Sequence, residues 1–570
     1  MTVAEYVIDF ISNKGVKDVF LVSGGGAMYL LEALGNRKDI NYICNHHEQA
    51  SAMAAEGYAR VTKNFGVCLV STGPATTNTL TGVECAWNDS IPVMFISGQA
   101  NSKTLIGNTG MRQRGTHEAN IVPMVKHITK YASLVTNPAE IQPIMEYAYA
   151  VMMEGRKGPV WIDIPLDIQN SEYTPIEGYK LTPPIIDPQK GLDVYTRIEK
   201  ALTNSNKTTI ILGAGAIPYK EDVVTWARIY GAAIVTTKNG YGAIPTTTPN
   251  YFGMIGTYGN RKANKVLQDS TLLIILGARL TTSTTGYNYA DFATYAYKIR
   301  VDVDSKQLHN TNVHIDESFH IDIKELVDYI PKVMIENPPM CWAENYKTIQ
   351  DLPNLQANVQ YVNSYFFYSQ LSKYEKKAPI LVTDQGAAFY SWSQAFTFDK
   401  DMFSFTNGGF SPMGYGLPAA IGACIASRKP VILIAGDGGF ELNIQELQTI
   451  KHYNLPILIF VFENKGYGSI KNTQDAFFNG HYVGSDPSSG VSCVSANQIA
   501  LGYGIPSFML KTDIDVITRL PEILTYTQGI VSVSLDPHQE IMPKVQGKRN
   551  ADGTITPGQL HNMYPYMEDK

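Results

Sequence analysis

Two apolar runs joined by a helix-like segment constrain the fold of this 570-residue chain most. They stand in VILIAGDGGFELNIQELQTIKHYNLPILIFVFENKGYGSIKNTQ, at residues 431–474. VILIA and ILIFVF are typical of buried strands, and Leu442, Leu447 and Ile450 between them recur at helical spacing. The pattern predicts a right-handed β-α-β unit, in which both strands end at the same edge of a parallel sheet.

The same alternation of apolar runs and helical patterns recurs along the chain and predicts an α/β fold with three doubly wound parallel-sheet domains. Two Pro-rich segments, TPIEGYKLTPPIIDPQK at 174–190 and IENPPMCW at 335–342, separate the blocks as extended linkers. We therefore expect four units, at 1–180, 188–345, 358–540 and 541–570. The last is expected to be an irregular arm over the surface or over a neighbouring subunit.

Charge and composition narrow the partners and the compartment. The net charge is −6 and the basic residues are scattered, which argues against nucleic acid or an anionic membrane surface and favours small-molecule substrates. The six Cys have no C-x-x-C spacing, as expected of reduced thiols. The N-terminus lacks the features of a signal peptide, and no apolar run approaches about 20 residues. We expect a cytoplasmic protein that does not enter a membrane.

The ends of the two apolar runs carry the residues of a candidate metal site. Asp437 follows the first run and Asn464 follows the second, so their side chains are expected to converge. A carboxylate, an amide oxygen and a nearby backbone carbonyl suit Mg²⁺, and the flanking glycines allow backbone amides to approach a diphosphate. Gly-Asp-Gly alone is more often a simple strand-to-helix turn, but the Asn after the next strand favours the metal site.

This Gly-Asp-Gly…Asn arrangement resembles the motif of thiamine diphosphate enzymes. The resemblance implies that Asp437 and Asn464 bind Mg²⁺ through their side chains and Gly466 through its carbonyl, and that the metal anchors the diphosphate. NHHEQASAMAAEGYARVT likewise resembles the segment whose Glu, here Glu48, activates the cofactor through its aminopyrimidine. A lone Glu at that position would ordinarily be a solvated residue of a helix's first turn. Met413 matches the residue that buttresses the cofactor, whose further expected contacts are Gly24, Gly25, Gln385, Gly386, Gly436, Gly438, Gly439 and Tyr467.

The resemblance covers nearly the whole chain and points to the acetolactate synthase (acetohydroxyacid synthase) branch. Segments such as VSTGPATTNTLTGVECAWNDSIPVMFISGQ, GPVWIDIPLDIQ and GGFSPMGYGLPAAIGA have counterparts there in the same order. It implies pyrimidine-binding, central and diphosphate-binding domains. It also implies a homo-oligomer, a dimer or a tetramer, with the active site at a subunit interface, where Glu48 acts on a cofactor held by the partner chain.

Several positions depart from that branch. Thr116-His117 replaces its Phe-Gln, and Ser469, Lys471 and Thr473 replace an apolar Met/Trp segment, which predicts a more polar and basic substrate pocket. Neutral drift of a loop is the alternative. We expect Gln99, His117 and Lys471 to contact the substrates, with Glu48, Gln99 and His117 as the catalytic set.

The central block resembles the segments that hold FAD in the synthase. The candidate flavin residues are Gly213, Gly215, Gly256, Asp302, Asp304 and Asp322. However, LTTS at 280–283 replaces the branch's FDDR, and a glycine-rich loop alone is weak support. Bound FAD, another nucleotide and a vestigial pocket all stay open.

The resemblance implies a thiamine diphosphate- and Mg²⁺-dependent carboligase. Such an enzyme decarboxylates a 2-oxo acid, most simply pyruvate, and transfers the two-carbon unit to a carbonyl acceptor, either a 2-oxo acid or a keto-sugar. A 2-oxo acid decarboxylase without ligation is the alternative. A non-catalytic cofactor-binding protein and a nicotinamide oxidoreductase built on the central block rank lower.

Overall fold

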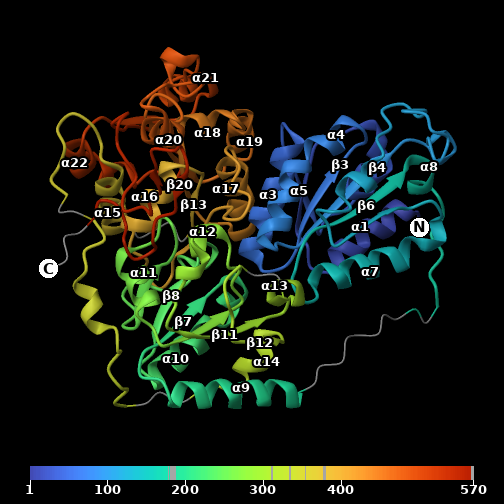
Figure 1. Cartoon of the computed structure of the whole chain (residues 1–570). Helices are drawn as coiled ribbons and strands as arrows, with labels where there is room; N and C mark the ends of the chain where they lie inside the picture. Colours follow the sequence, from blue (N-terminus) through green and yellow to red (C-terminus); the bar gives the residue numbers. More distant parts are fainter. Residues whose placement is uncertain are drawn as a thin grey trace.

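A computed structural model of the chain describes residues 1–177, 179, 188–309, 312–332, 336–352, 355–375 and 380–566. The predicted linkers at 174–190 and 335–342 fall in part outside these ranges, as do the last residues of the predicted arm. The described residues form three six-stranded sheets, each entirely parallel, and one two-stranded hairpin. The three parallel-sheet α/β units expected from the sequence are therefore confirmed (Figure 1).

The N-terminal sheet, drawn in blue to cyan in Figure 1, has the strand order β2-β1-β3-β4-β6-β5. Its strands are β1 (Asp18–Leu21), β2 (Asn41–Cys44), β3 (Gly66–Val70), β4 (Val93–Gln99), β5 (Tyr131–Leu134) and β6 (Val160–Pro165). Its helices are α1 (Val3–Asn13), α2 (Met28–Gly35), α3 (Glu48–Thr62), α4 (Pro74–Asn78), α5 (Leu80–Asp89), α6 (Ile121–Val125), α7 (Ile141–Met153) and α8 (Leu166–Gln169).

The central sheet has the order β12-β11-β10-β7-β8-β9, in which the strand order reverses once, between β7 and β10. Its strands are β7 (Thr208–Leu212), β8 (Ala233–Thr236), β9 (Tyr251–Met254), β10 (Leu272–Leu276), β11 (Tyr297–Asp302) and β12 (Glu317–His320). Its helices are α9 (Pro188–Thr203), α10 (Lys220–Ile229), α11 (Arg261–Gln268), α12 (Thr282–Thr285), α13 (Ser305–His309) and α14 (Ile323–Val327).

The C-terminal sheet, β14-β13-β15-β16-β18-β17, repeats the topology of the N-terminal one. Its strands are β13 (Ile380–Thr383), β14 (Phe403–Phe405), β15 (Val431–Gly436), β16 (Ile457–Glu463), β17 (Ser507–Leu510) and β18 (Gly529–Ser534). Its helices are α15 (Ser364–Tyr374), α16 (Ala387–Ala395), α17 (Gly416–Ser427), α18 (Asp437–Glu441), α19 (Leu447–His452), α20 (Gly468–Phe478), α21 (Ala496–Tyr503) and α22 (Asp513–Ile523). Helices cover both faces of this sheet, which is why its central strands β15 and β16 are apolar runs.

One apolar core joins the N-terminal and C-terminal units. It contains Phe20 and Phe95 from the first sheet and Leu433 and Ile459 from the third, with α3 and α17 packed between the two sheets. Figure 1 shows these two helices side by side at the boundary of the blue and orange units. The contact fixes the relative position of the two sheets that carry the expected cofactor residues.

The chain beyond β18 wraps back over the molecule. The hairpin of β19 (Lys548–Arg549) and β20 (Ile555–Thr556) lies here, and Arg549 donates a hydrogen bond to the carbonyl of Phe477 at the end of α20. Farther on, Arg261 of α11 donates to the carbonyls of Met563 and Pro565. The expected arm therefore lies over the chain's own central and C-terminal units.

Candidate active site

Asp437 organises the carboxyl edge of the C-terminal sheet. It follows β15, and its side chain is only 5 % exposed. Its Oδ2 accepts hydrogen bonds from the backbone amides of Asn464, Lys465 and Gly466, at 3.1, 3.1 and 3.3 Å. These residues follow β16, which pairs with β15 in parallel. The two strand ends therefore meet, as the β-α-β pattern predicts.

The oxygens at this edge fit a divalent cation. Oδ1 of Asn464 is buried and has no hydrogen-bond partner among the described residues, an arrangement that costs free energy unless a donor or a cation occupies the site. Burial raises the pKa of Asp437 to about 6, although the backbone amides oppose that shift. A carboxylate beside an orphaned amide oxygen and a backbone carbonyl is a hard-oxygen set of the kind that Mg²⁺ prefers.

The glycines of this edge are required by close contacts. A Cβ on Gly438 would lie 2.2 Å from Cε1 of Tyr467, and one on Gly466 would lie 2.4 Å from the carbonyl oxygen of Ser485. Gly466 also has a φ of +127°, in the region that favours glycine. Gly436, in contrast, has no atom within 4 Å of its Cβ position, so open space remains there for a ligand.

Asp384 is a carboxylate of this edge that the sequence analysis missed. It follows β13 and accepts hydrogen bonds from the amides of Gln385, at 2.7 Å, and Gly414, at 3.0 Å. Burial raises the pKa of Asp384 to about 6. Because Gly414 follows Met413, Asp384 holds the Met413 loop beside the Asp437 turn. The signal in the sequence was VTDQG, an Asp directly after an apolar run, as in IAGDGG.

Other expected cofactor contacts lie on the same edge. Gly386, with a φ of +77°, is the residue that precedes α16. The Gln385 side chain donates to Oγ1 of Thr406 and to the carbonyl of Asn407, so it is turned toward the loop that leads to Met413. The Met413 side chain is 41 % exposed, as a residue that faces a ligand or a partner would be.

Glu48 lies on the N-terminal unit, as the first residue of α3. Its carboxylate accepts a hydrogen bond from Nδ2 of Asn78 at 2.9 Å. The preceding loop is tied to the C-terminal unit by Glu446, which is fully buried and was missed in the sequence. Glu446 accepts from Nδ2 of Asn45 at 2.8 Å and from the amide of His46 at 2.9 Å. Gly24 follows β1 and packs on Ser71, while Gly25 has open space around its Cβ position.

Gln99 and His117 are brought close to each other by Thr72. The Thr72 hydroxyl lies 2.8 Å from Oε1 of Gln99 and 3.1 Å from the His117 carbonyl oxygen, and these two acceptors share its single proton. Nε2 of Gln99 donates to Asp163 and to the Ala119 carbonyl, so the Gln99 amide is engaged by the protein at both ends. The His117 side chain is exposed, and its backbone has a φ of +54°.

Lys471 lies apart from that pair, on α20. It is 5 % exposed, and its ammonium donates to the carbonyl of Pro537 at 3.2 Å. Ser469 and Thr473 of the same helix line a pocket. Lys544, which the sequence analysis did not single out, lines that pocket too.

The residues expected to hold FAD have contacts within the protein. A Cβ on Gly213 would lie 2.2 Å from the Gly277 carbonyl oxygen. The Asp302 carboxylate accepts a hydrogen bond from the Asp304 amide. The Asp304 carboxylate forms an ion pair with Arg156, and the Asp322 side chain caps α14. Gly215 packs on Gly277, and Gly256 has a φ of +122° and packs on Ser283. None of these contacts points to a flavin, which stays a prediction.

Comparisons with known proteins match all three units of the chain to one family of enzymes. Residues 1–122 match the family model "Thiamine pyrophosphate enzyme, N-terminal TPP binding domain", 195–330 match its central domain, and 384–533 match its C-terminal TPP binding domain. The acetolactate synthase large subunit of Cyanidium caldarium is 30% identical, over 96% of this chain and 95% of its own. The isozyme 1 large subunit of Escherichia coli is 29% identical, over 95% of this chain and 96% of its own.

A third relative, the probable acetolactate synthase large subunit of Methanocaldococcus jannaschii, is 30% identical over 95% of this chain and 93% of its own. Within the described ranges, no helix has the length and apolar content needed to cross a membrane.

Proposed function

Because the chain belongs to the acetolactate synthase-like branch of the thiamine diphosphate (thiamine pyrophosphate) enzymes, we propose that it decarboxylates a 2-oxo acid, most simply pyruvate, and transfers the two-carbon unit to a carbonyl acceptor. The observation that carries this proposal is the meeting of Asp437 with 464–466 beside the orphaned Oδ1 of Asn464. It is an arrangement suited to a cation that in turn binds a diphosphate.

We assign Mg²⁺ to Asp437, Asn464 and the Gly466 carbonyl. The thiamine diphosphate contacts are those expected from the sequence, namely Gly24, Gly25, Glu48, Gln385, Gly386, Met413, Gly436, Gly438, Gly439, Gly466 and Tyr467. When bound, the cofactor supplies the electron sink for decarboxylation and for carbon–carbon bond formation. The protein positions the substrates, excludes water and holds the activating proton at the Glu48 carboxyl group.

The substrate residues take separate roles in this proposal. His117 is exposed beside the carboxyl edge of the N-terminal sheet and is the residue we assign to the 2-oxo acid. Gln99 is a positioning residue, which acts on His117 through Thr72. Lys471, whose ammonium donates to the Pro537 carbonyl, stays the third substrate candidate.

We also propose a homodimer in which Glu48 of one subunit serves a cofactor held by Asp437 of the partner subunit. Three large apolar side chains at the C-terminal edge support it, because Phe410, Met413 and Leu442 are 47, 41 and 50 % exposed. Mixing Glu48→Gln with Asp437→Ala subunits tests the arrangement. Activity should return in the mixture, because a mixed dimer rebuilds one intact site. Inactive mixed dimers would place both residues in one subunit's site.

The role of Glu48 is tested by Glu48→Gln. This change keeps the shape of the side chain and its contact with Asn78, but removes the acid that holds the activating proton. We expect turnover to fall by about 100-fold or more while calorimetric binding of thiamine diphosphate with Mg²⁺ is retained. Glu32→Gln, an exposed change on α2, is the control. Near-normal turnover of Glu48→Gln would refute the assignment.

The reaction itself is tested by proton NMR of the protein with thiamine diphosphate, Mg²⁺ and pyruvate. Acetolactate would show transfer to a second pyruvate, and acetoin would show transfer to acetaldehyde. Acetaldehyde alone would indicate a decarboxylase, or a ligase that lacks its acceptor. Untouched pyruvate in the presence of bound cofactor would overturn the choice of donor.

A further inference from the structure

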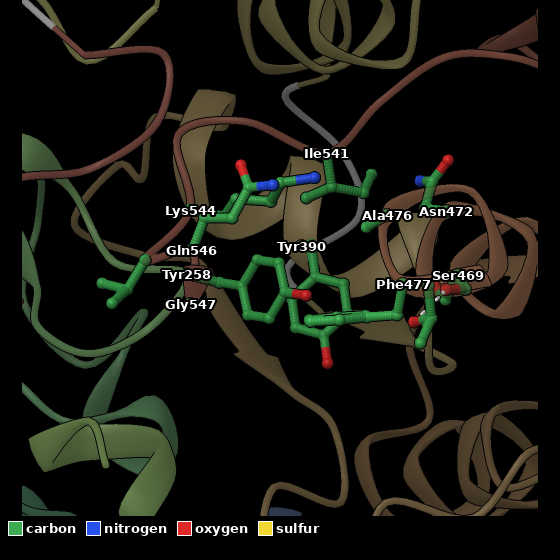
Figure 2. Close-up of a pocket in the computed structure, with 12 residues that line it drawn as sticks. Tyr258, Tyr390, Ser469, Asn472, Ala476, Phe477, Ile541, Lys544, Gln546 and Gly547 are labelled. Carbon is green, nitrogen blue, oxygen red and sulfur yellow. Dashed lines mark hydrogen bonds between the residues drawn. The ribbon is translucent and has the colours of Figure 1, made fainter. Parts of the chain in front are cut away.

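A pocket lies where the C-terminal arm crosses α16 and α20 (Figure 2). Its volume is about 120 Å³, room for a few water molecules or one small sugar. The central unit contributes Tyr258 and α16 contributes Tyr390, while α20 and the arm supply the remaining walls. The lining from these two segments is Ser469, Asn472, Thr473, Ala476, Phe477, Ile541, Lys544, Val545, Gln546 and Gly547.

The pocket adjoins the proposed active site. Helix α16 follows Gly386 directly, and α20 begins two residues after Gly466, so both helices leave the sheet edge that carries Asp437. A Cβ on Gly386 would lie 3.5 Å from Oγ of Ser469, which is itself a wall of the pocket. One end of the pocket, at Ser469, therefore lies beside Gly386, an expected cofactor contact.

The arm that closes the pocket is fixed to the rest of the protein. The amide of Val545 donates to the Thr257 carbonyl at 2.7 Å, and the Gln394 side chain bonds the carbonyls of Tyr258 and Pro543. These contacts join the arm to the segment that carries Tyr258, and Gln394 of α16 bonds both. The arm is therefore a fixed wall of the pocket.

The lining combines aromatic faces with neutral polar groups. Tyr258 and Tyr390 stack with ring centroids 4.0 Å apart and an interplanar angle of 27°. Oε1 of Gln546 is buried and has no hydrogen-bond partner among the described residues, so a hydroxyl donor would satisfy it. Figure 2 shows the two rings at the centre, with Ser469 and Asn472 of α20 on one side and Lys544 and Gln546 of the arm on the other.

Of the described residues that line the pocket, only Lys544 has a charged side chain, and it already has an anion beside it. Nζ of Lys544 lies 3.7 Å from Oε2 of Glu540 and 5.6 Å from the Tyr564 ring centroid. Because this cation already has an anion and an aromatic ring beside it, the carboxylate of a second 2-oxo acid would gain little from Lys544 and would be repelled by Glu540.

We propose that this pocket binds the carbonyl acceptor, and that the acceptor is a neutral, hydroxylated carbonyl compound of about monosaccharide size. The inference rests on the proposed function and specifies its acceptor. C–H faces of such a molecule pack on the tyrosine rings, while its hydroxyls bond Gln546 and the polar side chains of α20.

The reaction balances without an oxidant or a reductant. Pyruvate loses CO₂ as its C1–C2 bond breaks, a new bond joins C2 to the carbonyl carbon of the acceptor, and the acceptor oxygen takes up a proton. The product is a hydroxy-ketone, and it is branched where the acceptor is a ketone.

Binding is tested without turnover by using xylitol, a polyol that has no carbonyl group, with L-lactate as the carboxylate probe. Saturation-transfer NMR on the full chain with thiamine diphosphate and Mg²⁺ should show contact with xylitol. Gln546→Met removes the buried acceptor at similar size and should weaken xylitol binding about tenfold, as expected for one lost hydrogen bond at a buried group. Tyr258→Leu, which removes the ring stack, is the second variant.

Two variants outside the pocket serve as matched controls. Gln559→Met changes an exposed glutamine of the arm, and Tyr295→Leu changes a tyrosine that is 88 % exposed. Both should bind xylitol as the unsubstituted chain does. Melting temperatures establish that each variant is folded, and Gln546→Met keeps the test decisive if Tyr258→Leu unfolds.

Two outcomes would overturn the inference. One is binding of L-lactate in preference to xylitol; the other is xylitol binding that is absent or unchanged by Gln546→Met. Release of CO₂ from pyruvate, measured in parallel, reports on the proposed function alone. Pyruvate decarboxylation with no polyol binding would therefore refute the acceptor while leaving the function standing. Polyol binding with no decarboxylation of any 2-oxo acid would refute the function, and with it the acceptor role of the pocket.

L-Erythrulose, a hydroxylated ketone, supplies the catalytic readout. In competition with pyruvate as acceptor, it should yield most of the product, and Gln546→Met should shift the product toward acetolactate. Acetolactate as the main product of the unsubstituted chain would contradict the inference.

Discussion

Asp163 is a buried acid whose effect on stability depends on pH. It lies within β6, and its two carboxylate oxygens accept hydrogen bonds from Oγ of Ser97 at 2.6 Å and from Nε2 of Gln99 at 2.9 Å. Burial raises the pKa of Asp163 to about 7, although both hydrogen bonds favour the charged form. Since the carboxyl group of an unfolded Asp titrates at about pH 4, the folded chain holds a proton between these pH values that the unfolded chain releases. The folded state is therefore destabilised progressively as the pH rises from 4 to 7.

Asp163→Asn should remove that dependence, because Asn stays neutral and keeps a hydrogen-bonding amide at the same place. We expect this variant to gain in melting temperature over the unsubstituted chain as the pH rises. The difference between the two should grow by a few degrees from pH 5 to pH 8. Melting curves across this range give the measurement, with the exposed Asp193→Asn as control. A difference that stays constant with pH would show that Asp163 does not titrate in this range.

At the scale of elements, the crossing of α3 and α17 sets the relation between the two cofactor sheets. A Cβ on Gly422 of α17 would lie 1.9 Å from the carbonyl oxygen of Ala54, and one on Gly57 of α3 would lie 2.4 Å from that of Ala419. Each helix thus presents a glycine to the backbone of the other, and neither can accept a methyl group without moving. Because α3 begins at Glu48, such a movement displaces the proposed activating acid.

Gly422→Ala should therefore cost about 1–3 kcal/mol of unfolding free energy, and it should lower turnover more than cofactor binding. Gly35→Ala is the matched control, since Gly35 ends α2 with no atom within 4 Å of its Cβ position. Denaturant unfolding of both variants gives the loss of unfolding free energy, and kcat gives the loss of turnover. Equal effects of the two substitutions would rule out the close approach as the cause.

The strands were predictable because a parallel strand buried on both faces is a short apolar run, as in β15 and β16. The segment between these strands was harder to predict, because its helix is interrupted. Helix α18 ends at Glu441, α19 begins at Leu447, and Leu442, expected on the apolar face, is 50 % exposed. The helical course is broken at Asn443, whose side-chain amide donates to the distant Gly414 carbonyl at 2.8 Å.

The candidate site shows the same limit of prediction. Asp437 and Asn464 follow apolar runs directly, so topology alone places them together. Glu446 lies inside a helical pattern and acts on a loop about 400 positions away in sequence. No local pattern could have revealed that partner.

For the whole molecule, all three units meet at Asp89. This buried carboxylate accepts from Arg60 of its own unit at 2.6 Å, and from Asn239 and Arg279 of the central unit at 2.7 and 3.3 Å. It also accepts from the amide of Gly408 in the C-terminal unit at 2.8 Å. Burial alone would raise the pKa of Asp89, but the two arginines hold it below its usual value, so the charged form ties the units together.

Asp89→Asn should weaken all of these contacts at once. It leaves Arg279 without its buried anion and puts an amide donor opposite Arg60, a change of the kind that costs about 3–5 kcal/mol. Because the affected contacts join different units, we expect calorimetric unfolding to lose cooperativity, with the single transition broadening or splitting and beginning at a lower temperature. Asp304→Asn breaks a partly exposed ion pair with Arg156 that also joins two units, and it should shift the transition by far less. If both variants unfold alike, the coupling between the units resides in the shared apolar core of α3 and α17 instead of in Asp89.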